Sequence, residues 1–345
     1  QNNEVEAGVV TGSLLRRTDS ATPSPVTVQT SEQLKAQGIT TVADAIRSLS
    51  ADNSGSVPAA FGNGFAAGAT GVALRGLTVN STLVLTDGLR NASYPLADDG
   101  QRSFVDLNSI PFNAVERIET LKDGASSLYG ADAIGGVVNI IMKSNFQGMG
   151  ADLSVGTSQH GGGDQYRFNG EIGHGDLDTD KYNMYLDVEY QLDKRIRIDQ
   201  RGYPYNTFDL SGIPGGTNDN PGAGGSTFYG QVKRATMGTP GDISTGVALD
   251  GDLWRPLRTC AADAPLTTAA GGTYCAQNVA TFGDVQPKQE RVGAYGRFTI
   301  KPNDDLQAYI SASFVQSKTS TTGAPRNISS STPHNLSNIV LPALL

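Results

Sequence analysis

Hydrophobic and polar residues alternate along several segments in the second half of the chain, from about residue 150 onward. Within 184–192 every even-numbered residue is apolar, and the residues between them are Tyr, Asp, Glu and Gln. The same period of two recurs in 292–300 and 306–314, and less regularly in 150–157 and 166–172. Successive side chains of a β-strand point to opposite faces, so this period is typical of strands with one apolar face. The pattern predicts five strands.

The lengths of the connections between these strands help to distinguish two kinds of sheet. Alternation alone favours a half-buried soluble sheet and a membrane barrel equally. Short polar segments, 176–180 and 302–305, join the second strand to the third and the fourth to the fifth, whereas about 95 residues separate the third from the fourth. Short turns on one side and long exterior loops on the other are typical of outer-membrane barrels. We therefore predict antiparallel transmembrane β-barrel strands within 150–345, with a long extracellular loop at about 195–290.

The first half of the chain shows signals of short helices and strands instead. Thr30 with Gln33 three residues later is a capping-box pattern, and Thr41 with Asp44 repeats the signal before an apolar helical face. Apolar and β-branched runs bounded by glycine and aspartate predict strands at 72–75, 82–86, 115–121 and 137–142. We expect residues 26–145 to form one α+β domain, preceded by a flexible, mostly polar arm at 1–25.

Composition and charge exclude several other classes of protein. Only 17% of the 345 residues are charged, and the 42 glycines lack the three-residue period of collagen. The chain has no block of lysine and arginine for nucleic acid and no run of about 18–20 apolar residues for a membrane-spanning helix. The net charge of −8 also disfavours a polyanionic partner.

The few residues with metal-binding or nucleophilic chemistry do not form a recognisable site. Cys260 and Cys275 lie in a Gly/Thr/Ala-rich segment, where their even number and spacing favour a disulfide in an oxidising compartment over two unpaired thiols. The histidines have no metal-ligand spacing to these cysteines and form no catalytic pattern; they are His160, His174 and His334. The sequence therefore predicts no enzyme, no metal site and no cofactor.

One long segment of the first half carries a family signature. The segment 115–119, followed by 122–130 and 133–140, resembles the plug-domain signature of TonB-dependent outer-membrane receptors, and three further blocks fall upstream in the family's order, at 42–46, 74–77 and 83–88. The resemblance implies a plug domain at 26–145 inside a barrel of about 22 strands, in the bacterial outer membrane. Five strands do not close such a barrel, so we expect this chain to be the N-terminal part of a longer receptor.

The N-terminal arm contains a candidate TonB box, the short segment that pairs with TonB in this family. Its residues are Glu6, Ala7, Gly8, Val9, Val10, Thr11 and Gly12. An extended, β-branched segment is suited to add as a strand to the edge of a partner's sheet. The alternative is that 9–11 is simply the first strand of the plug.

Basic residues within the plug motifs are candidates for holding the plug to the barrel, because plug arginines pair with barrel glutamates in this family. The candidates are Arg75, Arg117 and Lys122. A charge in a partly desolvated interface needs a partner of opposite sign. The alternative is that each of them is solvated in a wet lumen.

Two plug loops rich in small and polar residues are candidates for substrate contact. Long loops in a compact domain are commonly functional, and these offer hydrogen-bond donors, acceptors and aromatic rings. The candidates are Phe61, Asn63, Phe65, Asn91, Tyr94, Asp98, Asp99, Gln101 and Arg102. The alternative is that they are ordinary polar loop residues.

The resemblance implies active import of a scarce nutrient, energised through TonB and its inner-membrane complex. The partners it implies are TonB, outer-membrane lipid and a small ligand such as an iron chelate, cobalamin, an oligosaccharide or a peptide, and the sequence does not choose among these ligands. One alternative is a surface receptor or sensor that binds a ligand or partner without importing it. Another is a secreted soluble β-protein.

Overall fold

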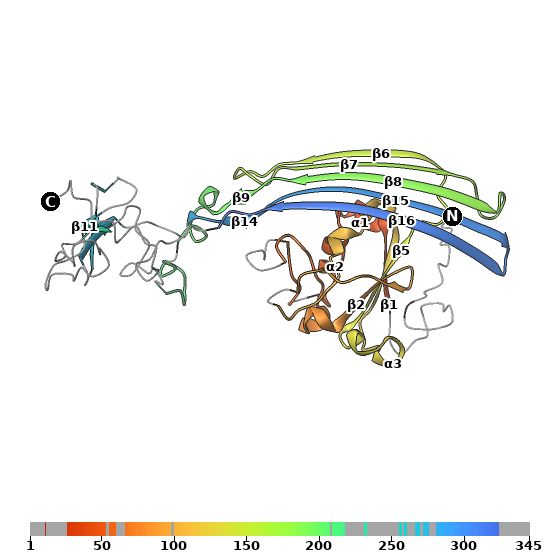
Figure 1. The fold of residues 1–345 in the computed structure, drawn as a ribbon, viewed down its shortest axis with the longest axis horizontal. Helices are drawn as coiled ribbons and strands as arrows, with labels where there is room; N and C mark the ends of the chain where they lie inside the picture. The colour runs from red at the N-terminus through yellow and green to blue at the C-terminus, as the bar shows by residue number, and fades with distance from the viewer. Residues whose placement is uncertain are drawn as a thin grey trace, which may run out of the picture. The chain divides into compact units, whose positions relative to one another are not determined.

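Two β-sheets organise the part of the chain that carries the candidate site. The computed structural model describes Thr11 and residues 26–52, 55–59, 66–97, 100–207, 209–217, 231–232, 255–256, 259–260, 266–269, 272–275 and 281–323. The chain divides into two compact units, Gln1–Ile196 with Asp284–Thr321, and Arg197–Gly283 with Thr322–Leu345. Both sheets belong to the first unit (Figure 1).

The first sheet is formed by five short strands in the order β1-β4-β5-β2-β3. Their bounds are Val26–Thr30 for β1, Val115–Leu121 for β4, Gly136–Met142 for β5, Thr82–Thr86 for β2 and Leu89–Arg90 for β3. Strands β2 and β5 run parallel, and the other neighbours are antiparallel. We call this sheet and its helices the plug.

Short helices surround the plug sheet, and their boundaries follow the capping signals in the sequence. Helix α1 (Ser31–Ala36) begins at the Thr30–Gln33 capping box, and α2 (Val42–Arg47) begins at Thr41, whose side chain accepts the backbone N–H of Asp44. The remaining short helices are η2 (Leu74–Gly76), η3 (Val79–Ser81), η4 (Leu107–Ser109), η5 (Phe112–Ala114), α3 (Ser126–Tyr129) and η6 (Ala131–Ala133). Both helix starts predicted from the sequence are therefore confirmed.

One predicted strand of the plug is wrong. The sequence predicted a strand at 72–75, but 74–76 forms the 3₁₀ turn η2, in which Arg75 has a φ of 62°. A left-handed residue cannot continue an extended strand. Only the bridge between Gly71 and Val57 gives this region sheet-like pairing.

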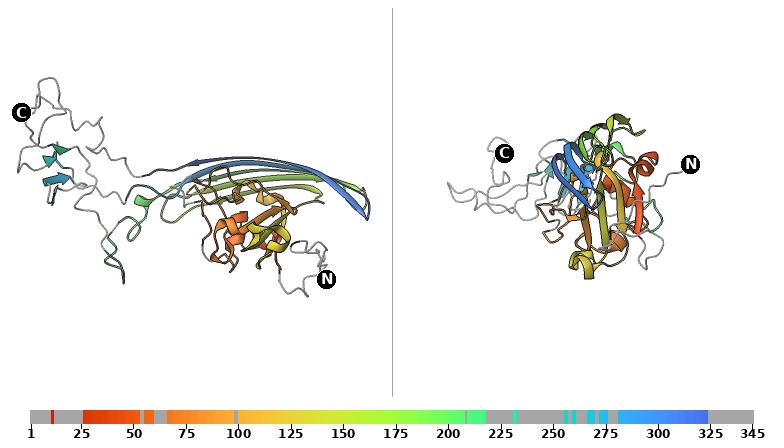
Figure 2. Two further views of the ribbon diagram at one scale, coloured as in Figure 1. Left: turned by 60° about the horizontal axis from the view of Figure 1, so that its bottom comes forward. Right: turned by 90° about the vertical axis from the view of Figure 1, so that its right-hand side faces the viewer.

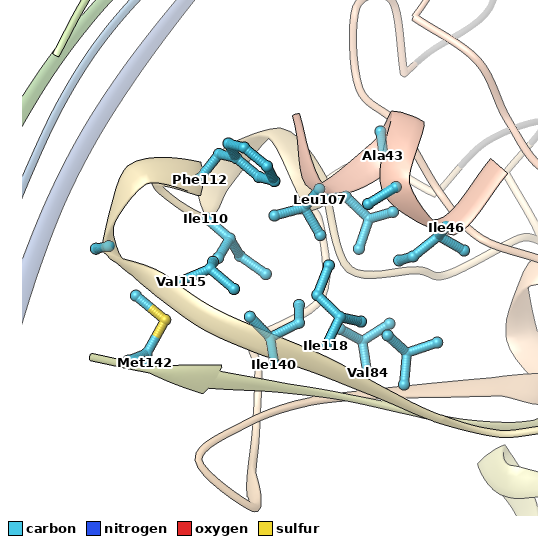
Figure 3. Packing of buried hydrophobic residues seen from close by; sticks show 14 of the residues in the cluster. Ala43, Ile46, Val84, Leu107, Ile110, Phe112, Val115, Ile118, Ile140 and Met142 are labelled. Atoms are coloured by element: carbon cyan, nitrogen blue, oxygen red, sulfur yellow. The ribbon is translucent and has the colours of Figure 1, made fainter. Parts of the chain in front are cut away.

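Apolar side chains on one face of the plug sheet form the main core. Ile118 and Val84 lie on this face with Ile140, and they pack with Ala43 and Ile46 of α2 (Figure 3). A smaller apolar cluster lies on the opposite face and includes Leu85. Both faces of the sheet are therefore covered, which agrees with the near-continuous apolar sequence of β2 and β5.

The second sheet contains the five strands predicted from the alternating segments, all antiparallel, in the order β16-β15-β8-β7-β6. Their bounds are Gly148–Gly156 for β6, Gln165–His174 for β7, Tyr182–Asp193 for β8, Lys288–Asn303 for β15 and Leu306–Ser320 for β16. Figure 2 shows these strands as long, curved ribbons beside the plug. We call this sheet the wall.

The central strands β8 and β15 of the wall expose their apolar positions and bury most of their polar positions. In β8, Met184, Leu186 and Val188 are 41–48% exposed, whereas Asn183 and Asp187, at alternate positions, are at most 1% exposed. A half-buried soluble sheet has the opposite arrangement, with its apolar face inward. The burial pattern of these strands therefore matches strands with lipid outside and a polar interior.

The long connection between β8 and β15 contains short elements. They are β9 (Ile196–Arg197), η7 (Ile198–Gln200), β10 (Gln231–Val232), β11 (Arg255–Pro256), β12 (Leu266–Ala269), β13 (Gly272–Cys275) and β14 (Asp284–Gln286). Strands β12 and β13 pair as a hairpin, and Cys275 at the end of β13 forms a disulfide with Cys260. The predicted cysteine pairing is thus present. The extracellular position of this connection stays a prediction.

No described helix of the chain is long and apolar enough to cross a membrane.

Truncating the core of the plug should lower its stability strongly. Ile118 is fully buried, so Ile118→Ala leaves a cavity and should reduce the free energy of unfolding by about 2–5 kcal/mol. Leu89→Ala is the control, since Leu89 is 65% exposed. Urea unfolding of the plug in the detergent-solubilised protein measures both, and equal effects of the two substitutions would contradict the assignment of the core.

Candidate functional site

The inner face of the wall meets the plug through a small set of polar contacts. Asp87 in the turn between β2 and β3 is one centre of this interface. Its Oδ2 accepts from Arg297 Nη1 of β15 at 2.6 Å, and its Oδ1 accepts from the backbone N–H of Met142 at 2.9 Å. Both side chains of the ion pair are largely buried, at 13% and 6% exposure. One carboxylate therefore joins the end of β5 to the wall.

Local sequence explains why Asp87 reaches the wall. The Thr86-Asp87-Gly88 turn holds Asp87 at a φ of 49° and Gly88 at 79°. Aspartate and glycine are among the residues that tolerate this left-handed conformation. On the wall side, Arg297 lies over the ring of Tyr309, with 4.0 Å between its Cζ and the ring centroid. The ring restricts the guanidinium on one side while Asp87 binds it.

A second contact joins the end of the plug to β7. Lys143 directly follows β5, and its Nζ donates to Glu171 Oε2 at 2.7 Å. Tyr185 of β8 donates its hydroxyl to the same oxygen at 2.8 Å. The ammonium also lies 5.0 Å from the ring centroid of Phe146. The lysine charge is thus matched by a wall carboxylate at the point where the chain passes from plug to wall.

A third contact runs through an amide. Asn113 in η5 donates Nδ2 to Asp187 Oδ1 of β8 at 2.7 Å and accepts from Lys35 Nζ at 2.8 Å. Asp187 is completely buried. The amide therefore bridges the ammonium group of Lys35 and the carboxylate of Asp187, which do not contact each other directly.

The fourth contact requires a glycine in the plug. Gln289 of β15 donates Nε2 to the carbonyl oxygen of Gly68 at 2.7 Å. A Cβ at Gly68 would lie 2.1 Å from Thr319 Oγ1, and its φ of 82° is also unfavourable for other residues. Close approach of the plug backbone to the wall depends on this position having no side chain.

The three latch candidates do not make these contacts. Arg75 pairs with Asp123, 3.0 Å apart, and Arg117 pairs with Glu116 and Glu119, so both bind carboxylates of the plug itself. Lys122 is half-buried and makes no ion pair with a residue that the structure describes. Burial raises the pKa of Glu116, and the Arg117 charge beside it opposes that shift. Within the described wall, the ion pairs to the plug are those of Asp87 and Lys143, and the latch role of Arg75, Arg117 and Lys122 stays a prediction.

Sequence reasoning missed these residues for a definable reason. Alternation identifies the inward polar positions of the strands, and Thr86-Asp87-Gly88 is a recognisable turn. Neither signal says which inward position of β15 lies opposite the turn. That depends on how two separately formed sheets are placed against each other.

The substrate-contact candidates do not converge on one site in the described residues. Phe61, Asn63, Phe65, Asp98 and Asp99 lie outside them. Asn91 exchanges hydrogen bonds with Thr86 at the end of β2, whereas the carbonyl of Gln101 accepts from Asn80, just before β2 begins. Tyr94 stacks on Phe104, with 5.9 Å between ring centroids, and Arg102 is half-buried. Their role in substrate binding stays a prediction.

The segment that begins at Ala66 is held in place by a half-buried carboxylate, that of Asp106. Asp106 accepts the backbone N–H groups of Thr70 and Asn108 at 2.9 and 3.0 Å. Burial raises the pKa of Asp106, although both hydrogen bonds oppose the shift. This segment is therefore fixed, both by Asp106 and by the contact of Gly68 with the wall.

Of the candidate TonB box, only Thr11 lies among the described residues. It is 4% exposed and contacts two polar residues of the plug sheet, Glu119 and Asn139. Whether the rest of Glu6–Gly12 acts as a box is not tested by this contact. It does show that the arm reaches the middle of the plug.

The described residues offer no metal site. No group of three or more His, Cys, Asp or Glu side chains in this part of the chain is placed to hold an ion. The Asp176–Asp180 turn between β7 and β8 resembles a calcium loop only in its spacing of acids. Hydrogen bonds from the backbone N–H of Thr179 and from Asn145 lower the pKa of Asp176 to about 2, so this carboxylate caps its own turn.

Comparison with known proteins identifies the plug. A family model described as the TonB-dependent receptor plug domain matches residues 18–137. The vitamin B12 transporter BtuB of Vibrio cholerae serotype O1 is 42% identical over 83 residues, which are 24% of this chain and 13% of BtuB. The iron-regulated outer membrane virulence protein of the same species is 31% identical over 153 residues, 44% of this chain and 22% of that protein.

A solved structure extends the likeness beyond the plug. A mutant ferric enterobactin receptor PfeA from Pseudomonas aeruginosa, in complex with enterobactin, has a TM-score of 0.52 at 18% identity, covering 88% of this chain and 34% of PfeA. At this identity the likeness shows the fold. The chain thus spans about a third of PfeA and smaller shares of the curated relatives. By name these relatives are a transporter, an outer membrane protein and a receptor. Residues 18–137 are therefore a plug domain of the TonB-dependent receptor type, and the antiparallel strands that follow share the fold of the PfeA structure.

Proposed function

We propose that this chain belongs to an active importer that carries a scarce nutrient across the bacterial outer membrane. In this proposal the exterior loops and the plug apex bind the nutrient, TonB engages Glu6–Gly12, and its inner-membrane complex supplies the energy that rearranges the plug. The observation that carries the proposal is the way the plug meets the wall, through a few discrete polar contacts.

Such an interface is suited to a plug that must move. The main apolar core lies within the plug, between its sheet and α2, and the wall adds only Tyr185 and Tyr295 to it. Polar groups such as Asp87 and Lys143 can exchange their wall partners for water when the plug shifts. Movement therefore leaves most of the apolar core intact.

The same contacts explain why movement needs an energy source. Deleting one partner of a buried ion pair by substitution costs about 3–5 kcal/mol, and pulling such a pair apart also costs free energy until both charges reach water. The interface contains the Arg297–Asp87 and Lys143–Glu171 pairs, all four side chains of which are at most 14% exposed. Thermal fluctuation rarely breaks both together, so external work is needed.

The substrate class follows only coarsely from the relatives. Their names include a vitamin B12 transporter, an iron-regulated protein and a ferric enterobactin receptor. We infer a scarce nutrient bound as a compact, polar molecule, with cobalamin and iron chelates as the first ligands to test. Binding assays with cobalamin, an iron chelate, an oligosaccharide and a peptide would identify the class of ligand.

Deletion of the candidate TonB box should separate binding from transport. A receptor lacking Glu6–Gly12 should still bind its ligand at the cell surface, because that segment is far along the chain from the exterior loop at about 195–290. Uptake should be lost, since TonB has no strand to pair with. Labelled-ligand binding and uptake are measured on the same cells, and undiminished transport by the deletion variant would contradict the proposal.

Neutralising the carboxylate of the main plug–wall contact should loosen the plug. Asp87→Asn leaves Arg297 buried without its counter-charge and should destabilise the plug by about 3 kcal/mol. Asp132→Asn is the matched control, because Asp132 pairs with Arg90 at the surface and should contribute less than about 1 kcal/mol. The urea concentration at the midpoint of plug release, measured in detergent, gives the effect of each substitution. Equal midpoints for the two variants would show that Asp87 does not hold the plug.

A further inference from the structure

Arg291, near the start of β15, is a buried cation that takes no part in the described ion pairs between plug and wall. It is 7% exposed. Its two terminal nitrogens donate to glutamine oxygens, and the carboxylates that stabilise its charge act from a greater distance; they are Asp106, Asp193 and Glu189. A buried charge without a directly bound counter-ion is unfavourable. We therefore expect the arginine to do something that an apolar side chain could not do.

One of its two hydrogen bonds sets the orientation of the amide that contacts the plug. Arg291 Nη2 donates to Gln289 Oε1 at 2.6 Å, and Gln289 Nε2 donates to the carbonyl oxygen of Gly68 at 2.7 Å. A guanidinium can only donate, so it holds the amide oxygen of Gln289 toward itself and leaves the NH₂ group for the plug. In the inverted amide, two oxygens would face each other at Gly68.

The other hydrogen bond of Arg291 is oriented by a carboxylate. Arg291 Nη1 donates to Gln191 Oε1 at 3.2 Å, and Gln191 Nε2 donates to Asp193 Oδ2 at 3.2 Å. An ionised carboxylate can only accept, so Asp193 holds the NH₂ group of Gln191 toward itself and leaves the amide oxygen for the arginine. Arg167 Nη2 donates to the other oxygen of Asp193 at 3.3 Å and balances its charge. Both amides therefore have a single favourable orientation.

Strand pairing explains why these side chains meet. On β15, Gln289 and Arg291 are two residues apart, and opposite them on β8 lie Asp193 and Gln191. Arg167 of β7 lies opposite Gln191 on its other side. Residues two apart on a strand share a face, so all five side chains belong to the inner face of the wall.

The plug segment that these hydrogen bonds reach is 66–71. Asn108 Nδ2 donates to the same Gly68 oxygen at 3.1 Å, so this carbonyl is held from the plug and from the wall. In the sequence the segment directly follows Phe65, one of the substrate-contact candidates. Three of its backbone N–H groups bond within the plug: Ala69 to Ala66, Thr70 to Asp106 and Gly71 to Val57. These three groups report whether the segment is held.

We propose that Arg291 is a positioning residue that acts through Gln289: it holds the plug segment 66–71 at one place on the wall, and so positions the substrate-contact residues that precede it. The link to substrate rests on the proposed function. Without Arg291 the amide of Gln289 is free to turn over, and a turned amide repels the Gly68 carbonyl. The wall then no longer holds this segment.

Amide hydrogen exchange on the full-length receptor, without added ligand or TonB, tests the proposal. Gln289→Glu keeps the size of the side chain and can still accept from Arg291, but it places an oxygen against Gly68. Arg291→Met removes the donors, whereas Arg291→Lys can still only donate. Peptides covering 66–71 should exchange about fivefold faster in Gln289→Glu and Arg291→Met than in the native receptor, and more slowly in Arg291→Lys than in Arg291→Met.

Gln165→Glu is the matched control. Gln165 of β7 lies opposite Asp193, on the side away from Gln289, and its Oε1 accepts from Arg167 at 3.0 Å. The same chemical change leaves that acceptor in place, so exchange at 66–71 should stay at the native rate. Peptides covering β4 should keep native exchange in every variant. An equal rise in Gln165→Glu or across β4 would overturn the proposal, as would native rates at 66–71 in both Gln289→Glu and Arg291→Met.

A double variant separates positioning from a general structural role. Gln289→Met removes the contact with Gly68, so Arg291 has nothing left to orient. Adding Arg291→Met to Gln289→Met should then leave exchange at 66–71 unchanged. A further rise would show that Arg291 acts independently of Gln289 and would overturn the proposal. Failure of the proposed import appears separately, as uptake that survives deletion of Glu6–Gly12.

Discussion

Burial of charge is the constraint on which this structure depends. A carboxylate or guanidinium removed from water must meet a partner, because an isolated buried charge is far too unfavourable. The wall exposes its apolar residues and buries its polar ones, so the plug has to supply matching groups wherever it touches the wall. Asp87, Lys143 and Asn113 fill this requirement at three points. The position of the plug is therefore fixed by charge matching more than by shape alone.

The same constraint explains why the contacts within the plug are mainly apolar, whereas the contacts between the plug and the wall are mainly polar. Apolar residues hold the plug sheet and α2 together as one body, and their packing does not change when the surroundings become wet. The contacts to the wall are few and polar, and each has an alternative partner in water. Cohesion within the plug and attachment of the plug to the wall thus depend on different kinds of interaction.

Much of the fold could be predicted from the sequence, because its signals are local. The period of two gave the wall strands, and the threonine caps located the starts of α1 and α2. The prediction of a strand at 72–75 was wrong, because the apolar sequence there contains no signal for the left-handed backbone of Arg75. The plug motifs identified the family, yet Arg75 and Arg117 bind carboxylates of the plug itself. Contacts such as Arg297 with Asp87 join positions 210 residues apart and depend on the placement of two sheets, which no local pattern encodes.

The Thr86-Asp87-Gly88 turn has a mechanical consequence. Asp87 binds the wall, and the next peptide N–H, that of Gly88, binds the amide that holds Thr11. Two adjacent residues, Asp87 and Gly88, thus connect the wall to the amide that binds the N-terminal arm. Thr11 is bonded to Glu119 of β4 and Asn139 of β5, so a load on Thr11 acts on the plug sheet itself as well as on the turn. The N-terminal arm, the middle of the plug sheet and the wall are in this way joined through a single short turn.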